Sequence, residues 1–303
     1  MKYLAGDAQA SVAILYPVCR WLSSRDAAAY EVMAAALQPA HVVSGGSTAL
    51  RASLRVGRDI GLFERLGPAR AGDEAADWVL RAPIRGQCDE WYADPVRFRV
   101  LVRRALLAKA VDDIAAGDTP SDVAVGLAWL LAHDPVSPLP QIYSDGPERA
   151  LNDQKLNSYI ANGAQWRPFY RWAVALGCAE LSQIGNRRLI LPDPTAALAE
   201  ELPPIPHAGM SARDFYATVA KALPVLDGGQ ISDFMRDERA ECADPRGDAM
   251  VGPAFSLALR RLESQGVIGL PSEADARHRV DGVLHGKRWT FDRVTLGREN
   301  DDA

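Results

Sequence analysis

The chain repeats one pattern three times: an amphipathic helix that ends at a glycine and is followed by two short strands. The three glycines are Gly61, Gly177 and Gly266, and each precedes a short apolar run and a polar turn. Glycine suits the end of a helix because it adopts the left-handed conformation without a side-chain clash. With 303 residues, the chain is long enough for two or three domains. The pattern predicts three small domains of one type.

Large apolar side chains recur on one face of these three helices when positions are counted back from the glycine. Eleven, seven and four residues before it stand Leu50, Leu54 and Gly57 in the first copy, Trp166, Tyr170 and Ala173 in the second, and Phe255, Leu259 and Leu262 in the third. Offsets of eleven, seven and four fall on one side of a helix. We expect this side to be buried in each domain, with a glycine interrupting it in the first copy.

Two shorter helices precede the glycine-ended helix in each copy. The periodicity predicts them over 9–22 and 26–37, over 121–132 and 149–161, and over 211–222 and 229–239. The second strand of each copy is expected at 78–80, 188–191 and 288–291. This order is typical of a winged helix-turn-helix, in which the third helix is the recognition helix and the strands form the wing.

The predicted fold is mainly α with small β wings: three winged helix-turn-helix domains in tandem. We place the domains at 1–89, 90–203 and 204–303, and expect a connecting helix over 95–116. The proline-rich stretch 202–206 is the expected linker before the third domain, because each proline lacks a backbone N–H and disfavours helix in the residue before it.

Arginines share the same register as the apolar face but point away from it. Arg55, Arg171 and Arg260 stand six residues before the glycines, and Arg51 and Arg167 stand ten before. Such exposed positions can contact phosphates or base edges. Further basic residues lie in the predicted wings, at Arg187 and Arg188 and at Arg277, His278 and Arg279. The candidate nucleic-acid-binding residues are Arg51, Arg55, Arg58, Arg167, Arg171, Arg187 and Arg188.

Two plainer interpretations stand beside this one. The arginines can form a solvated face, or pair with the nearby acids Asp59, Glu180 and Glu263. The aromatic residues crowded on the second glycine-ended helix can pack a core, anchor another domain or stack on bases; they are Trp166, Phe169, Tyr170 and Trp172.

The charge balance limits how DNA can be bound. The formal net charge is −5, and only residues 1–85 are net positive, with 10 Lys and Arg against 8 Asp and Glu. Non-specific affinity for DNA depends on neutralised phosphates. We therefore expect weak binding to double-stranded DNA by the isolated protein, strengthened by partner proteins.

The sequence contains no motif for catalysis or metal binding. The cysteines and histidines are scattered, without a paired ligand spacing, and we expect Cys19, Cys88, Cys178 and Cys242 to be reduced thiols. Neither a glycine-rich phosphate loop nor a serine nucleophile motif occurs. We expect no cofactor, no metal and no enzymatic activity. Because neither a membrane span nor a signal peptide is recognisable, we expect a cytoplasmic protein.

Two runs in the second copy resemble a known family. Phe169-Tyr-Arg-Trp-Ala-Val-Ala-Leu-Gly177 and Leu189-Ile-Leu-Pro-Asp-Pro-Thr-Ala196 are similar to DpdG, an accessory protein of bacterial gene clusters that insert 7-deazapurines into DNA and restrict foreign DNA. The resemblance implies a non-catalytic partner beside helicases and modification enzymes in phage defence. It implies no known active residues.

The preferred function is a non-enzymatic, DNA-associated adaptor of a multiprotein genome-defence complex. One alternative is a winged-helix transcription regulator, which needs a ligand pocket or a dimerising helix, and 95–116 is the candidate for that helix. The other is a protein-interaction scaffold without DNA binding, which the acidic balance favours.

Overall fold

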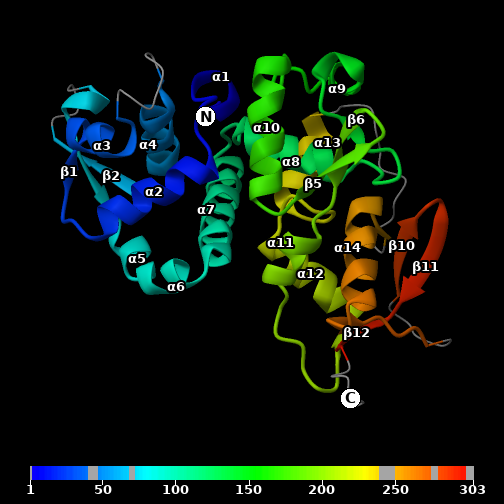
Figure 1. The fold of residues 1–303 in the computed structure, drawn as a ribbon. Coiled ribbons are helices and arrows are strands. Elements are labelled where there is room, and N and C mark those ends of the chain that lie inside the picture. Colours follow the sequence, from blue (N-terminus) through cyan, green and yellow to red (C-terminus); the bar gives the residue numbers. More distant parts are fainter. Residues whose placement is uncertain (1, 40–46, 68–71, 239–249, 274–278, 298–303) are drawn as a thin grey trace.

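A long helix, α7 (Pro95–Ala115), stands between two groups of shorter elements (Figure 1). The computed structural model describes residues 2–39, 47–67, 72–238, 250–273 and 279–297. The described chain is mainly α with small, mostly antiparallel sheets, as predicted. We call residues 12–80 the first unit, 122–192 the second unit and 210–296 the third unit.

The first and second units repeat the same order of α-helices and strands, and differ in the position of a 3₁₀ turn. The first contains α2 (Val12–Ser23), β1 (Ala28–Ala29), α3 (Tyr30–Leu37), α4 (Ala49–Asp59), β2 (Phe63–Leu66), a 3₁₀ turn η1 (Asp73–Ala75) and β3 (Asp77–Leu80). The second contains α8 (Asp122–Leu131), β4 (Leu139–Pro140), a 3₁₀ turn η2 (Tyr143–Asp145), α9 (Pro147–Asp153), α10 (Gly163–Ala175), β5 (Ala179–Ile184) and β6 (Arg187–Pro192). The sheets are antiparallel, with strand orders β1-β3-β2 and β4-β6-β5. In both units the strand after the first helix therefore pairs with the last strand.

The third unit carries an additional hairpin. It consists of β7 (Met210–Ser211), α12 (Ala212–Ala222), α13 (Gln230–Glu238), β8 (Met250–Val251), α14 (Pro253–Ser264), β9 (Ile268–Gly269), β10 (Val280–Leu284), β11 (Lys287–Phe291) and β12 (Arg293–Leu296). The sheet β7-β12-β9 has the same strand order as the other units. The hairpin β10–β11 forms a separate sheet with β8.

The strand predicted at 288–291 is present, but it is not the partner of the strand that follows Gly266. Residues 288–291 belong to β11, which pairs with β10, whereas β9 pairs with β12. The alternating pattern runs through both β11 and β12, and Asp292 separates them. Sequence alternation identifies strands but does not identify their partners.

The three glycines lie where the register predicts. Gly61, Gly177 and Gly266 follow α4, α10 and α14, with φ angles of 78°, 76° and 71°. Gly57, the interruption in the first apolar face, has a packing role. A Cβ built there would lie 2.3 Å from Cε2 of Phe63. The missing side chain makes room for the aromatic ring of β2 against α4.

The prediction that Tyr170 is buried is wrong. Phe169 takes the core position instead, and a Cβ built on Gly126 of α8 would lie 2.6 Å from its Cε2. Tyr170 is only partly buried. Trp166 and Trp172 are buried, as expected for core packing, and the Trp166 ring lies edge-on to Trp129 at 6.0 Å between centroids.

A buried ion cluster joins α7 to the helix that follows the second unit, α11 (Thr195–Glu200). The fully buried Arg103 guanidinium donates to Glu200 at 2.8 Å, to Glu201 at 2.8 Å and to the Leu176 carbonyl at 3.0 Å. Arg104 donates two further bonds to Glu201. The predicted connector is thus anchored on one side by buried charges.

The N-terminal helix α1 (Tyr3–Gly6) lies against α8 and α10 and links the first and second units (Figure 1). Backbone N–H groups of Tyr3 and Leu4 donate to the two carboxylate oxygens of Asp122, at 2.8 and 2.9 Å. The Tyr3 hydroxyl donates to Asp59 of α4 at 2.5 Å. Burial raises the pKa of Asp122 to about 6, and the N–H donors oppose that rise.

The third unit packs on the second. Helix α13 lies against α8 and α7, and α14 lies against α11. Arg261 of α14 pairs with the buried carboxylate of Asp193 and, at 3.2 Å, with Glu180 of β5. Contacts therefore cross the proposed domain boundaries, which stay predictions.

Candidate nucleic-acid interface

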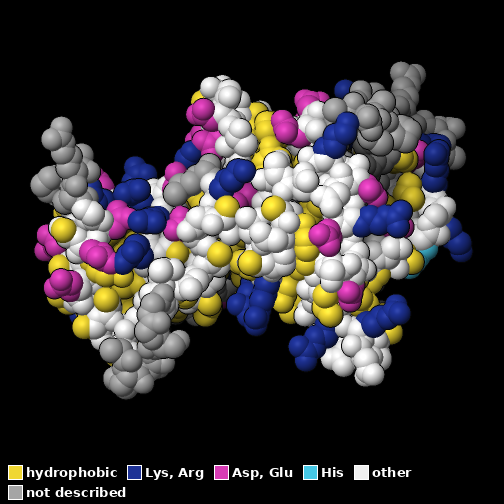
Figure 2. Space-filling model, turned by 90° about the horizontal axis from the view of Figure 1, so that it is seen from above, with side chains coloured by type: hydrophobic (Ala, Val, Ile, Leu, Met, Phe, Trp, Pro, Cys, Tyr) yellow, Lys and Arg dark blue, Asp and Glu magenta, His cyan; other side chains and the backbone are white. Residues whose placement is uncertain are grey.

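The arginines predicted in the first unit are paired with acids of the same unit. Arg51 pairs with Glu74, while Arg55 and Arg58 approach Asp73 at 2.6 and 3.6 Å. Asp73 and Glu74 lie in η1, between the two strands of the hairpin. In Figure 2, blue and magenta side chains are interleaved over this part of the molecule, on the left.

This pairing compensates the positive charge of α4. The hydrogen bond to Asp73 raises the pKa of Arg55, and Asp7 lies 3.8 Å from the same guanidinium. A phosphate approaching α4 would compete with these carboxylates. Of the acids proposed as partners from sequence, Asp59 instead accepts the Tyr3 hydroxyl. The residues that do pair, Asp73 and Glu74, were missed.

In the third unit, the basic residues of α14 face the protein. Arg260 lies over the Trp289 ring, 4.0 Å from its centroid, and pairs with Glu263 at 2.6 Å. The pairing with Glu263 was predicted. The wing residues Arg277 and His278 lie outside the described residues.

In the second unit, three of the predicted arginines converge on one groove. Arg167 of α10 and Arg187 and Arg188 of β6 line a depression of about 910 Å³, together with Tyr170 and Asn186. Its other lining residues are Pro138, Pro140, Gln141, Ile142, Asp145 and Leu189. The groove thus lies between the glycine-ended helix and the strand edge of the β5–β6 hairpin.

Local structure places these side chains. Helix α10 begins where the Asn162 side chain accepts the N–H of Gln165 at 3.1 Å, and Arg167 follows in the next turn. The β5–β6 hairpin reverses at Gly185, whose φ of 59° favours glycine, and Arg187 and Arg188 begin the returning strand. The Gln141 N–H donates to the Arg188 carbonyl at 3.0 Å and fixes that strand edge.

The arginines of this groove are exposed and uncompensated. Within the part of the chain that the structure describes, no carboxylate lies within ion-pair distance of Arg167, Arg171, Arg187 or Arg188. One acid, Asp145, lines the groove with the three arginines, so the lining is net positive. Arg171 is exposed one turn beyond Arg167 but does not line the groove.

A sequence model of the family described as DpdG-like matches residues 1–276 of the chain. The protein belongs to this family. The match confirms the resemblance drawn from the second copy, and extends it over the first two units and the third unit as far as residue 276. No curated protein and no solved structure matches the chain.

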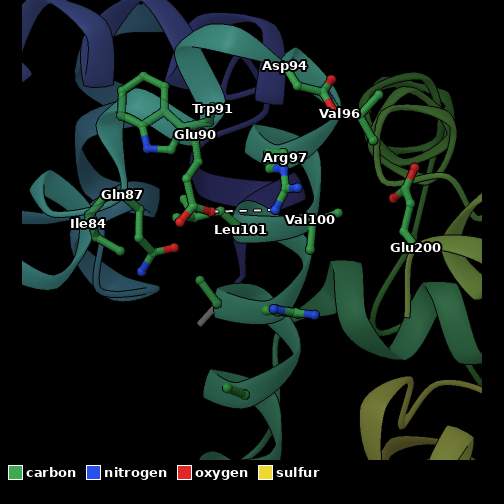
Figure 3. Close-up of a pocket in the computed structure, with 13 residues that line it drawn as sticks. Ile84, Gln87, Glu90, Trp91, Asp94, Val96, Arg97, Val100, Leu101 and Glu200 are labelled. Carbon is green, nitrogen blue, oxygen red and sulfur yellow. Dashed lines mark hydrogen bonds and ion pairs between the residues drawn. The ribbon is translucent and has the colours of Figure 1, made fainter. Parts of the chain in front are cut away.

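This DpdG-like protein has further grooves along α7. One, of about 640 Å³, lies between α7 and two short helices, α5 (Ala82–Arg85) and α6 (Cys88–Ala93), with Glu200 on the opposite rim (Figure 3). Glu90 and Arg97 approach to 3.6 Å in it. A second, mostly apolar groove of about 1040 Å³ lies between α7 and α12. Arg104 and Ala108 line both grooves.

Among the described residues, no group of three or more His, Cys, Asp and Glu side chains is placed to hold a metal ion. The described helices include none with the length and hydrophobicity needed to cross a membrane. Cys19, Cys88 and Cys178 are free thiols, as predicted, and Cys242 lies outside the described residues.

Proposed function

We propose that this DpdG-like protein is a non-enzymatic, cytoplasmic adaptor that associates with DNA through its second unit. The observation that carries the proposal is the net positive groove lined by Arg167, Arg187 and Arg188, none of which has a carboxylate within ion-pair distance among the described residues. In contrast, the arginines of α4 and α14 are already paired with acids or an aromatic ring.

The three units are proposed to be winged helices. The repeated strand orders β1-β3-β2, β4-β6-β5 and β7-β12-β9 support this, since in each unit the last strand lies between an early strand and the strand that follows the glycine-ended helix. In the third unit the early strand, β7, precedes the first helix instead of following it. In the second unit, α10 is then the recognition helix and β5–β6 is the wing. The β10–β11 hairpin is an addition specific to the third unit.

The groove suits a phosphodiester backbone. Phosphates are bound by arginine side chains that fix the position of a protein on a duplex without reading its sequence. Arg167 lies on the recognition helix and Arg187 and Arg188 lie on the wing, so a strand of DNA between them would be contacted from both sides. Arg171 would extend the contact along α10.

Two observations support the adaptor role: the family to which the chain belongs, and the grooves beside α7. The DpdG-like family connects the chain with a system that modifies DNA and restricts foreign DNA, the setting of phage defence. A net charge of −5 opposes tight binding of the isolated chain to DNA. The grooves beside α7 offer surfaces for partner proteins that would strengthen the association.

Fluorescence anisotropy on labelled duplex DNA at low salt tests the proposal. We expect micromolar or weaker binding that is similar on two unrelated sequences. The Arg187→Ala/Arg188→Ala variant should bind more weakly and reduce the slope of log affinity against log salt by nearly 2, because each phosphate contact contributes about 0.9 to that slope.

A matched control is Lys287→Ala/Arg288→Ala, which removes an exposed basic pair from the β11 strand of the third unit. Equal losses for the two variants would indicate attraction by overall charge, and contradict a site in the second unit. The absence of binding by the wild type at low salt would reject DNA association.

A scaffold without DNA binding is the second candidate. The acids that pair with the arginines of α4 favour it. Because this pairing compensates the positive charge of α4, that helix suits contact with a protein better than contact with DNA. A transcription regulator has less support, because α7, its candidate dimerising helix, buries Arg103 within the chain.

A further inference from the structure

The tip of the β5–β6 hairpin carries an unusually exposed apolar side chain. Ile184 is 66% exposed, and Ile142, which lines the arginine groove, is 62% exposed. Contacts within the described chain therefore leave most of the Ile184 side chain exposed to solvent. Burial of this apolar surface against a partner would stabilise a complex.

The hairpin holds Ile184 in a defined position. It pairs directly with Arg187 across the hairpin, so both side chains project from the same face of the sheet. Only Gly185 and Asn186 separate them, and Gly185 has positive φ while Asn186 does not, the arrangement of a tight type II′ turn. The short turn therefore presents Ile184 beside Arg187, and Arg188 follows on the opposite face of the strand.

We propose that Ile184 is a wedge that enters the minor groove of duplex DNA and partly unstacks one base step. This inference rests on the proposed function. Proteins that bend DNA insert aliphatic side chains between base pairs from the minor groove, while neighbouring basic residues hold the flanking phosphates. Arg187 would hold a phosphate beside Ile184, and Arg188 would hold one on the other face of the hairpin. This positive charge around the wedge is what selects nucleic acid over an apolar protein surface.

The test measures DNA bending separately from binding. The probes are a short duplex with a donor and an acceptor dye at its two ends, and the same duplex with 2-aminopurine at successive positions. Wild-type protein should increase energy transfer and brighten 2-aminopurine at one step. Ile184→Ala should abolish both signals and lower the affinity roughly tenfold through lost apolar burial, while the slope of log affinity against log salt stays unchanged.

Two further variants control the test. Val32→Ala removes a side chain that is 55% exposed on α3 and should leave binding and bending unchanged. Ile184→Leu should keep the bend. Circular dichroism should show all variants folded, since the substituted side chains are exposed.

The outcomes separate this inference from the proposed function. Duplex binding that depends on Arg187 and Arg188 but leaves the DNA straight, or bending that survives Ile184→Ala, would overturn the wedge alone. No salt-dependent binding by the wild type would overturn both.

Discussion

Single residues decide how each unit packs. At Gly57, the absence of a Cβ admits the ring of Phe63, and at Gly126 it admits the ring of Phe169. The register counted from Gly177 places Tyr170 in the core, yet Phe169 occupies it. Both residues are aromatic neighbours on one helix, so the pattern alone does not separate them. Gly126 of α8 distinguishes them, because it leaves room for the Phe169 ring.

Gly57→Ala should destabilise the protein by about 1 to 3 kcal/mol through overpacking against Phe63. This loss should exceed the gain of about 1 kcal/mol that alanine brings to a helix. Urea denaturation measures the difference. Gly163→Ala is the control, because its Cβ would lie 3.6 Å from the Tyr143 Cβ, an ordinary contact. If Gly57→Ala proves as stable as Gly163→Ala, the packing explanation is wrong.

Asp122 should make stability fall as pH rises from about 4 to about 6. Its folded-state pKa is about 6, whereas the unfolded carboxyl titrates near 4. The folded state therefore binds the extra proton in this window, and its favourable contribution is present at low pH and lost above the folded pKa. Asp122→Asn removes this titration.

Denaturation of both proteins across this pH range is the measurement. The unfolding free energy of the wild type should decline relative to Asp122→Asn by roughly 2 to 3 kcal/mol. Parallel curves would show that the N–H donors stabilise the carboxylate well enough to offset its burial. An unfolding free energy of the wild type that rises relative to that of the variant with increasing pH would show the same.

At the scale of elements, periodicity predicts the long helices well. The helices expected over 95–116 and 121–132 are found at Pro95–Ala115 and Asp122–Leu131. The helix expected over 149–161 ends at Asp153, shortly before Lys155 with its positive φ of 58°. The polar residues after it form turns, which a search for apolar spacing does not detect.

Two-residue strands and ion pairs between residues far apart in the chain could not be predicted from the sequence. β1, β4 and β7 contain two residues each, too few to show alternation. β4 even ends in Pro140, which is tolerated because the strand lies at an edge of the sheet. The sequence predicts Arg103 only as part of a connecting helix, because its partners Glu200 and Glu201 lie about a hundred residues away.

Arg103→Ala should destabilise the protein by about 3 to 5 kcal/mol, because it leaves Glu200 and Glu201 without their buried partner. Arg97→Ala on the same helix should cost no more than about 1 kcal/mol, since its pair with Glu90 is exposed. Thermal and urea denaturation give the comparison. Equal losses would mean that the buried cluster does not anchor α7.

At the scale of the whole molecule, the repeat and the family were accessible from sequence, but the unequal roles of the three copies were not. The same register places arginines on α4, α10 and α14. Folding pairs those of α4 with the acids of η1 and places Arg260 of α14 over the Trp289 ring. Only a tertiary structure reveals which arginines keep their charge available. The second unit is thereby distinguished from its neighbours.

The central claim is that the second unit contacts DNA. Its most direct test is the slope of log affinity against log salt, measured on duplex DNA for two matched triple variants. Arg167→Ala/Arg187→Ala/Arg188→Ala should flatten the slope by between about 2 and 3. Arg51→Ala/Arg55→Ala/Arg58→Ala should leave it nearly unchanged, because Glu74 and Asp73 already hold those side chains. A slope that both triple variants flatten equally, or that only the α4 variant flattens, would contradict the assignment of the DNA contact to the second unit.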